Sequence, residues 1–181
     1  MLAEELSRIV GARWVRTSRA ELATFSADGL PTHRRTPGVV VFPGPTAEVC
    51  AVLRLLAARG VPFVARGAGT GLSGGALAEA PEVLITLTRL AKIRSIDSVN
   101  RRAVVEPGVV NASLSRAAAP FDLMYAPDPS SQSACTIGGN VAENAGGPHC
   151  LKYGVTTNHV LSLEVALPSG ELVRLGSAAG E

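Results

Sequence analysis

The stretch V-P-F-V-A-R-G-A-G-T-G-L-S-G-G, residues 61–75, decides how this chain of 181 residues is organised. Residues 62–66 form a short apolar run that predicts a strand, and five of the nine residues that follow, 67–75, are glycines. Glycines adopt positive φ angles and let successive backbone N–H groups converge on an anion. The loop therefore predicts a phosphate or pyrophosphate site, with Thr70 and Ser73 as hydroxyl donors. The alternative is a flexible connection between two strands.

A nicotinamide-cofactor site is the first competing interpretation of this loop. Gly69, Gly71 and Gly74 satisfy the pattern G-x-G-x-x-G, which requires a helix directly after the glycines. Residues 76–80 leave no room for that helix before Pro81 and the next strand. No G-K-[S/T] follows, which excludes a triphosphate P-loop. The match is therefore interpreted as accidental.

The segments around the loop predict an α+β fold, with a small βαβ lobe followed by a mixed, strand-rich lobe. A helix over 46–59 joins two of the strands, and this crossover is long enough for parallel pairing. Further helices are expected over 2–10, from a Ser18/Glu21 capping pattern to about 28–29, and from Asn111 as cap to 118. The predicted strands cover residues 39–42, 62–66, 82–87, 92–97, 102–106, 160–167 and 171–175.

A second glycine-rich stretch, P-D-P-S-S-Q-S-A-C-T-I-G-G-N-V-A-E-N-A-G-G, covers residues 127–147. Ordering such a segment costs backbone entropy without burying much apolar surface, unless a ligand offsets the cost. Asn140 and Asn144 are four residues apart, so one helical turn is expected to present both amides and its N-terminal N–H groups to a ligand. An ordered surface loop is the alternative for this stretch.

Taken together, the two stretches resemble the vanillyl-alcohol-oxidase/PCMH-type FAD-binding domain. R-G-A-G-T-G-L-S-G-G, residues 66–75, is similar to the family's pyrophosphate loop. Residues 127–154, ending N-A-G-G-P-H-C-L-K-Y-G, are similar to the branch of the glycolate oxidase D-subunit and D-lactate dehydrogenase. The resemblance implies a two-lobed PCMH-type α+β domain, truncated at its C-terminus and lacking the substrate domain. Its expected parts are a helical segment over 1–35 and an incomplete FAD domain over 36–181, with lobes of about 36–90 and 91–181.

The same resemblance implies that FAD is bound non-covalently between the two lobes and accepts a hydride from C2 of a 2-hydroxy acid at flavin N5. Catalytic residues and the metal site of many members are expected in a following domain, and no metal ligand is assigned here. Carried over position by position, the residues implied to bind the cofactor are Gly67, Gly69, Thr70, Gly71, Leu72, Ser73, Gly74, Pro127, Ser131, Thr136, Gly138, Gly139, Asn140, Asn144, Gly147, Tyr153, Gly154 and Val160.

Four charged or titratable residues close to these motifs have alternative interpretations. Arg66 is either a partner for phosphate or part of a strand-end ion pair. Asp128, between two prolines, is at least as typical of a turn as of catalysis. His149 lies where a covalent flavin link is imaginable, although a plain loop histidine is the favoured interpretation. Glu143 is interpreted as a simple loop carboxylate.

Composition restricts the remaining partners. The net charge of +2 and the lack of a basic stripe argue against nucleic acid, and three cysteines without metal-type spacing indicate free thiols. The sequence has no signal peptide pattern and no apolar run of membrane-spanning length. A cytoplasmic location is therefore expected, or association with a membrane through partner subunits. The expected partners are FAD, a 2-hydroxy acid, and either a second copy of the chain or other oxidase subunits.

Two alternative functions remain open at this stage. The chain reaches residues 176–181 before the family's closing strands, so a truncated non-catalytic flavin-binding subunit or remnant is one alternative. The other is the FAD domain of a different oxidase, such as an alkyl-dihydroxyacetone-phosphate synthase.

Overall fold

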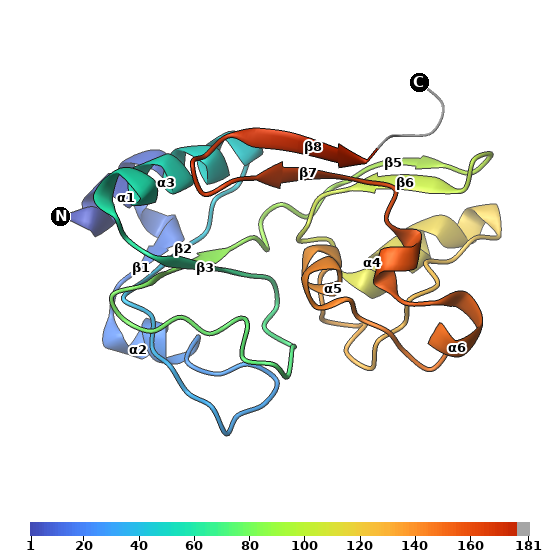
Figure 1. Cartoon of the computed structure of the whole chain (residues 1–181), viewed down its shortest axis with the longest axis horizontal. Helices are drawn as coiled ribbons and strands as arrows, with labels where there is room; N and C mark the ends of the chain where they lie inside the picture. Colours follow the sequence, from blue (N-terminus) through green and yellow to red (C-terminus); the bar gives the residue numbers. More distant parts are fainter. Residues whose placement is uncertain (177–181) are drawn as a thin grey trace. The chain divides into compact units, whose positions relative to one another are not determined.

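The computed structural model describes residues 1–176, which form two compact units (Figure 1). Of the described residues, unit 1 contains Met1–Arg66, Gly71–Arg89 and Leu161–Gly176, and unit 2 contains Gly67–Thr70 and Leu90–Val160. The chain passes from unit 1 to unit 2 after Arg89. Residues 161–176 group with unit 1, whereas lobe two was predicted to continue to 181. Residues 177–181 of the predicted domain lie outside the described residues.

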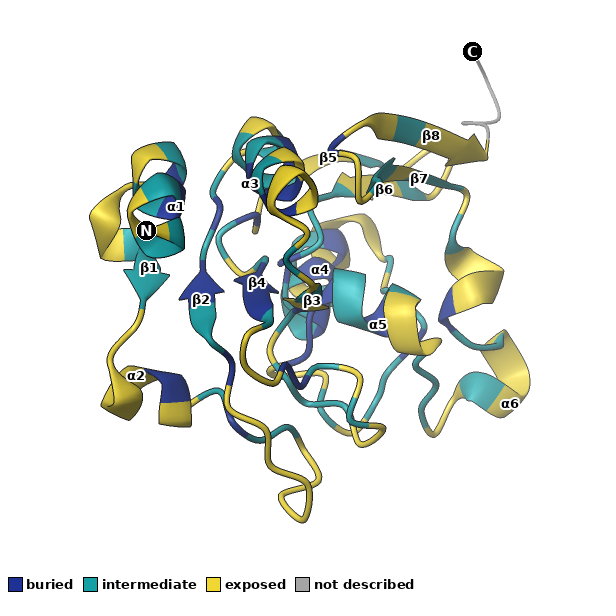
Figure 2. Cartoon of the chain, turned by 60° about the vertical axis from the view of Figure 1, so that its left-hand side comes forward, coloured by how far each residue is buried: buried dark blue, intermediate teal, exposed yellow. Residues whose placement is uncertain are grey.

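Unit 1 is built around a four-stranded sheet in the order β1-β2-β4-β3. The predicted parallel strands are present, but β4 lies between β2 and β3 and pairs with both of them. All four residues of β4 are buried, as Figure 2 shows, because helices and loops cover both faces of this central strand. The strands are β1 (Val15–Arg16), β2 (Val39–Val41), β3 (Phe63–Arg66) and β4 (Val83–Thr86).

Strand β1 is the part of this sheet that the sequence analysis missed. Val15 pairs antiparallel with Val41, so the segment 1–35, predicted as helical, also supplies an edge strand. Two residues are too few to show the alternation by which strands are recognised. The second predicted helix is also shorter than expected: α2 covers Arg19–Ala23, and the predicted Ser18 cap is confirmed by its bond from Glu21 N–H.

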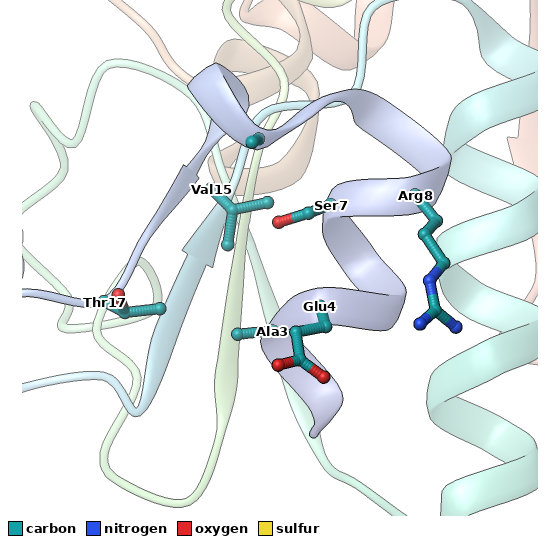
Figure 3. A pocket seen from close by; sticks show the side chains of 7 residues that line it. Ala3, Glu4, Ser7, Arg8, Val15 and Thr17 are labelled. Atoms are coloured by element: carbon teal, nitrogen blue, oxygen red, sulfur yellow. The ribbon is translucent and has the colours of Figure 1, made fainter.

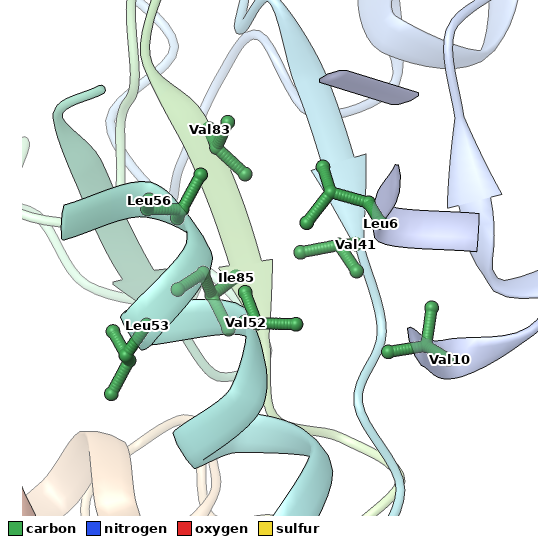
Figure 4. Close-up of a cluster of buried hydrophobic side chains, with 8 residues drawn as sticks. All are labelled: Leu6, Val10, Val41, Val52, Leu53, Leu56, Val83 and Ile85. Atoms are coloured by element: carbon green, nitrogen blue, oxygen red, sulfur yellow. The ribbon is translucent and has the colours of Figure 1, made fainter. Parts of the chain in front are cut away.

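Two helices cover one face of the sheet and form the main core (Figure 4). Leu6 and Val10 of α1 (Leu2–Val10) and Val52, Leu53 and Leu56 of α3 (Thr46–Arg59) pack against alternate residues of β2 and β4. Full burial of each such side chain stabilises the fold by roughly 1.5–3 kcal/mol. The opposite face of the sheet is covered by a smaller cluster, formed by Leu22, Val40, Ala78 and Leu84.

The predicted C-terminal hairpin is confirmed as β7 (Ser162–Ala166) and β8 (Leu172–Gly176). It is fastened within unit 1 by Arg54, whose Nη1 donates to the Gly170 carbonyl at 3.1 Å. Gly170 has a φ of 77°, and a Cβ at this position would lie 2.6 Å from the Cys50 carbonyl oxygen. A glycine is therefore required where the turn meets α3.

Unit 2 combines the other predicted hairpin with short helices. Strands β5 (Ile93–Asp97) and β6 (Arg102–Val105) pair antiparallel. Helix α4 (Asn111–Ala118) has Val110 and not Asn111 at its N-cap position, and the buried Asn111 Nδ2 donates to the Pro127 carbonyl at 2.9 Å. The remaining helices of unit 2 are η2 (Ala119–Phe121), α5 (Ile137–Glu143), α6 (Cys150–Tyr153) and η3 (Thr156–His159). Among residues 1–176, no helix has the length and apolar character needed to cross a membrane.

Candidate cofactor site

The first glycine loop begins where β3 ends, at the carboxyl edge of the parallel strands. This edge is the usual ligand side of an open α/β sheet. Gly69 and Gly74 have φ angles of 71° and 79°, a conformation that favours glycine. Within residues 1–176, the N–H groups of Ala68 to Leu72 donate to no protein acceptor. Five consecutive donors are thus available to an anion, which fits the pyrophosphate of FAD.

No helix follows the glycines, so the nicotinamide-cofactor pattern is accidental, as predicted. The far end of the loop is instead bonded to the protein. The Gly74 N–H donates to Asp28 Oδ2 at 3.0 Å, and the buried Arg66 guanidinium donates to the carbonyls of Ala27 and Ala76. Burial lowers the pKa of Arg66, and the charge of Asp28 opposes this shift. Arg66 is therefore engaged with the main chain of the loop.

Within unit 2, the start of the first loop touches the second glycine-rich stretch. A Cβ on Gly67 would overlap the hydroxyl oxygen of Thr136, so Gly67 is required for close approach. The same hydroxyl caps α5, where it accepts from the Gly139 N–H at 3.4 Å. Thr136 is itself buried and forms an isolated bridge with Val110. The residues assigned to two distant motifs therefore meet at one side chain.

The expectation that α5 offers its N-terminal N–H groups to a ligand is wrong. The Ile137 N–H donates to the Val109 carbonyl at 2.8 Å, and the Gly138 N–H donates to the Pro107 carbonyl at 2.7 Å. Since Gly139 donates to the Thr136 hydroxyl, the first three donors of the helix have protein acceptors. Gly138 also allows close packing, because a Cβ there would lie 2.6 Å from Pro107 Cβ.

The two asparagines of α5 differ in their surroundings. Asn140 is only 3% exposed, and its Nδ2 has no hydrogen-bond partner in the described part of the chain. Asn144 is exposed, ends the helix with a φ of 50°, and accepts at Oδ1 from the Thr157 N–H at 3.0 Å. A buried amide donor is costly unless it is bonded, so Asn140 fits an acceptor atom of a ligand. The Oδ1 atom of Asn144 is already bonded to the main chain of the protein.

Asp128 organises the end of the second stretch. It accepts from the ring Nδ1 of His149 at 2.5 Å and from the His149 N–H at 3.3 Å. These bonds, the ring bond foremost, lower the pKa of Asp128. A Cβ on Gly147 would overlap Asp128, so this glycine is also required for close approach. The turn-forming interpretation of Asp128 is therefore favoured by its contacts.

The other predicted cofactor-binding residues lie in both units and are partly engaged in local structure. The Ser131 carbonyl accepts from the N–H groups of Ala134 and Cys135. Gly154 has a φ of 83°, and a Cβ there would lie 2.6 Å from Asn158 Oδ1. Pro127 is buried, Val160 is half-buried, and Tyr153 and Leu72 are exposed.

A surface hollow elsewhere in unit 1 does not belong to this set. It lies beside α1 and β1 and is lined by Ala3, Glu4, Ser7, Val15 and Thr17 among others (Figure 3). None of the predicted cofactor-binding residues lines it. The hollow is open, and its charged groups are the Glu4 carboxylate and the Arg8 guanidinium.

Sequence reasoning missed two residues that shape the site. Asp28 was placed at a helix end, and its contact with Gly74 bridges 46 positions. Asn111 was expected to cap a helix, whereas it holds the Pro127 carbonyl within unit 2. No local pattern signals either contact, because both partners are main-chain atoms.

A glycine loop with unbonded N–H groups at the carboxyl end of parallel strands is typical of a domain that binds a phosphate-bearing ligand. Comparison with known proteins specifies the class. A family model described as FAD binding domain matches residues 37–176. The chain belongs to this family, and its cofactor is FAD.

Among curated relatives, the chain is 52% identical over 159 residues to the glycolate oxidase subunit GlcD of Escherichia coli (strain K12), covering 88% of this chain and 32% of that protein. It is 41% identical over 158 residues to a D-lactate dehydrogenase of Anaerostipes hadrus, covering 87% and 33%. The chain thus spans about a third of the length of these relatives. A solved alkyldihydroxyacetonephosphate synthase has a TM-score of 0.86 at 20% identity, covering 99% and 35%, and this likeness shows the fold alone. The predicted PCMH-type α+β fold is confirmed.

Proposed function

We propose that this chain is the FAD-binding part of a flavin-dependent dehydrogenase or oxidase of 2-hydroxy acids, of the glycolate or D-lactate type. The observation that carries cofactor binding is the run of unbonded N–H groups from Ala68 to Leu72 at the end of β3. The substrate class is supported by the names of the relatives that share 52% and 41% of the aligned residues. When bound, FAD supplies the hydride acceptor at N5 for the hydrogen on C2 of the acid.

The residues proposed to hold FAD are those of the two glycine-rich stretches. In the first, main-chain N–H groups from Ala68 to Leu72 meet the pyrophosphate, with Thr70 as a further donor. In the second, the buried amide of Asn140 donates to the cofactor, while Thr136, Gly138, Gly139 and Gly147 shape the wall by close packing. Ser73, Pro127, Ser131, Asn144, Tyr153, Gly154 and Val160 complete the proposed set.

Several further properties belong to the same proposal. FAD is held non-covalently, the FAD domain covers 36–181 in two lobes, and the protein is cytoplasmic or attached to a membrane through partner subunits. The word "subunit" in the name of the relative GlcD supports association with other subunits. A second copy of the chain is the alternative partner.

The test is a visible absorption spectrum of the purified chain, before and after incubation with FAD and removal of the excess. Flavin bands that stay with the protein, and that acid precipitation releases into the supernatant, are the expected result. Anaerobic addition of glycolate or D-lactate then tests the reaction by bleaching of these bands. Retained FAD that neither acid bleaches would establish cofactor binding and restrict this chain to the flavin-binding part of the proposed enzyme. A protein that cannot be loaded with FAD would contradict the proposal.

A further inference from the structure

Arg66 fastens the second half of the first glycine loop to the N-terminal part of unit 1. Its side chain is buried, with 8% of the residue exposed. Nη1 donates to the Ala76 carbonyl at 3.1 Å, and Nη2 donates to the Ala27 carbonyl at 3.0 Å. The planar guanidinium can serve two acceptors at once, which an ammonium group on a flexible stem does less well. One side chain at the end of β3 thereby bonds both to Ala27 in the N-terminal part of unit 1 and to Ala76 in the loop.

Asp28 fixes the same half of the loop from the other side. Its Oδ2 accepts from the Gly74 N–H at 3.0 Å, and its Oδ1 accepts from the Leu30 N–H at 2.8 Å. Next to it, the Gly29 N–H donates to the Gly71 carbonyl at 2.9 Å. Gly74 has a φ of 79°, so this contact fixes a residue whose backbone is otherwise permissive.

The charge of Asp28 makes its position informative. A carboxylate close to a pyrophosphate raises the energy of the bound anion, so Asp28 is unfavourable for binding by its charge alone. The Gly74 N–H is already bonded to this carboxylate and is unavailable to phosphate. Asp28 therefore contributes to FAD binding through the geometry of the loop, and Arg66 partly offsets its charge.

We propose that Arg66 and Asp28 are positioning residues that hold Gly71–Ala76 in one conformation and confine the pyrophosphate to the N–H groups of Ala68–Leu72. This inference rests on the proposed FAD binding. All contacts of this clamp are made by the protein itself, so the loop is ordered before the cofactor arrives. A preorganised loop binds more tightly because less ordering entropy is lost on association.

The experiment measures the FAD dissociation constant and the apo melting temperature of Asp28→Ala. We expect the dissociation constant to rise about tenfold, although the substitution removes a negative charge. Arg66→Lys keeps the positive charge but loses the planar pair of donors, and it should also raise the FAD dissociation constant. Asp97→Ala is the matched control, because Asp97 accepts from the Asn100 N–H at 2.9 Å in an exposed turn of unit 2. This control should change FAD affinity less than twofold.

Tighter or unchanged FAD binding by Asp28→Ala would overturn the proposal. An Arg66→Lys variant that binds FAD as tightly as the unmodified chain would overturn it as well. A second readout separates the clamp from cofactor binding itself. Amide hydrogen exchange in the apo protein should accelerate in Asp28→Ala at Gly29 and Leu77, whose N–H groups donate to the Gly71 and Gly74 carbonyls, and stay unchanged there in Asp97→Ala. If the unmodified chain binds no FAD, the proposed function fails while this exchange result still decides whether the clamp exists. Unchanged exchange in Asp28→Ala would show that it does not.

Discussion

The two glycine-rich stretches have similar compositions but, apart from Gly67, use glycine for different physical reasons. In the first loop, the N–H groups of Ala68–Leu72 have no protein acceptor in the described chain, and two glycines have positive φ. In the second stretch, Gly138 and Gly147 lie where a Cβ would meet Pro107 or Asp128. The N–H groups that open α5 are bonded there. Glycine density therefore does not identify a ligand loop, whereas an inventory of bonded and unbonded N–H groups does.

The largest effect is expected from a charge in the first loop. Gly71→Asp places a carboxylate beside the proposed pyrophosphate and should weaken FAD binding by more than about 100-fold, or about 2.7 kcal/mol. The apo melting temperature should change little, because the effect acts on the ligand. Gly71→Asn is the uncharged control of nearly equal size. Titration with FAD measures both, and equal affinities for the two variants would refute the loop assignment.

In the second stretch, adding a methyl group to a closely packed glycine should lower the stability of the protein more than its affinity for FAD. Gly138→Ala puts a Cβ 2.6 Å from Pro107 Cβ and 3.0 Å from its carbonyl oxygen, which should destabilise the protein by about 1–3 kcal/mol. The neighbouring Gly139→Ala is the control, since its Cβ meets only the Thr136 hydroxyl at 3.4 Å. Denaturant unfolding without FAD compares them. Equal stability of the two variants would show that the second stretch does not need glycine for packing.

Asn140 is the residue of the second stretch that we expect to act on the cofactor. Asn140→Leu should weaken FAD binding about tenfold, or about 1.4 kcal/mol, while the apo protein keeps its stability. Replacing a buried amide without a partner by an apolar side chain of similar size is nearly neutral for folding. Calorimetric titration and thermal unfolding test the two parts separately. A variant that retains flavin as well as the parent would remove Asn140 from the site.

The smallest effect concerns pH and the Asp128–His149 contact. The folded-state pKa of Asp128 lies below its ordinary value of 3.8, so its stabilisation is present above that value. This stabilisation is lost as the pH falls through the folded-state pKa. His149→Ala should therefore flatten the fall of melting temperature below a pH of about 4. The exposed His33 supplies the control His33→Ala, and identical acid slopes in all three proteins would show that the contact adds nothing.

The sequence predicted the parts of the fold that depend on local patterns. The α1 and α3 helices, both hairpins and the position of the first loop after a parallel strand were all accessible from periodicity and turn residues. The insertion of β4 between β2 and β3 was not, because strand order is set by packing of whole elements. The bonds of Ile137 and Gly138 to Val109 and Pro107 also escaped prediction, since backbone acceptors about 30 positions upstream leave no trace in residue type.

Unit 1 is discontinuous in the chain, and this has a consequence for synthesis on the ribosome. The Gly170 turn packs against Arg54 and Cys50 of α3, and Ala166 packs against the main core. Between these early and late parts of unit 1, the chain runs through Leu90–Val160, which belongs to unit 2. At translation rates of about 5–20 residues per second, this interval takes roughly 4–14 s to synthesise. The nascent sheet must wait that long, with part of its apolar surface uncovered, and chaperones have their best opportunity to bind in that interval.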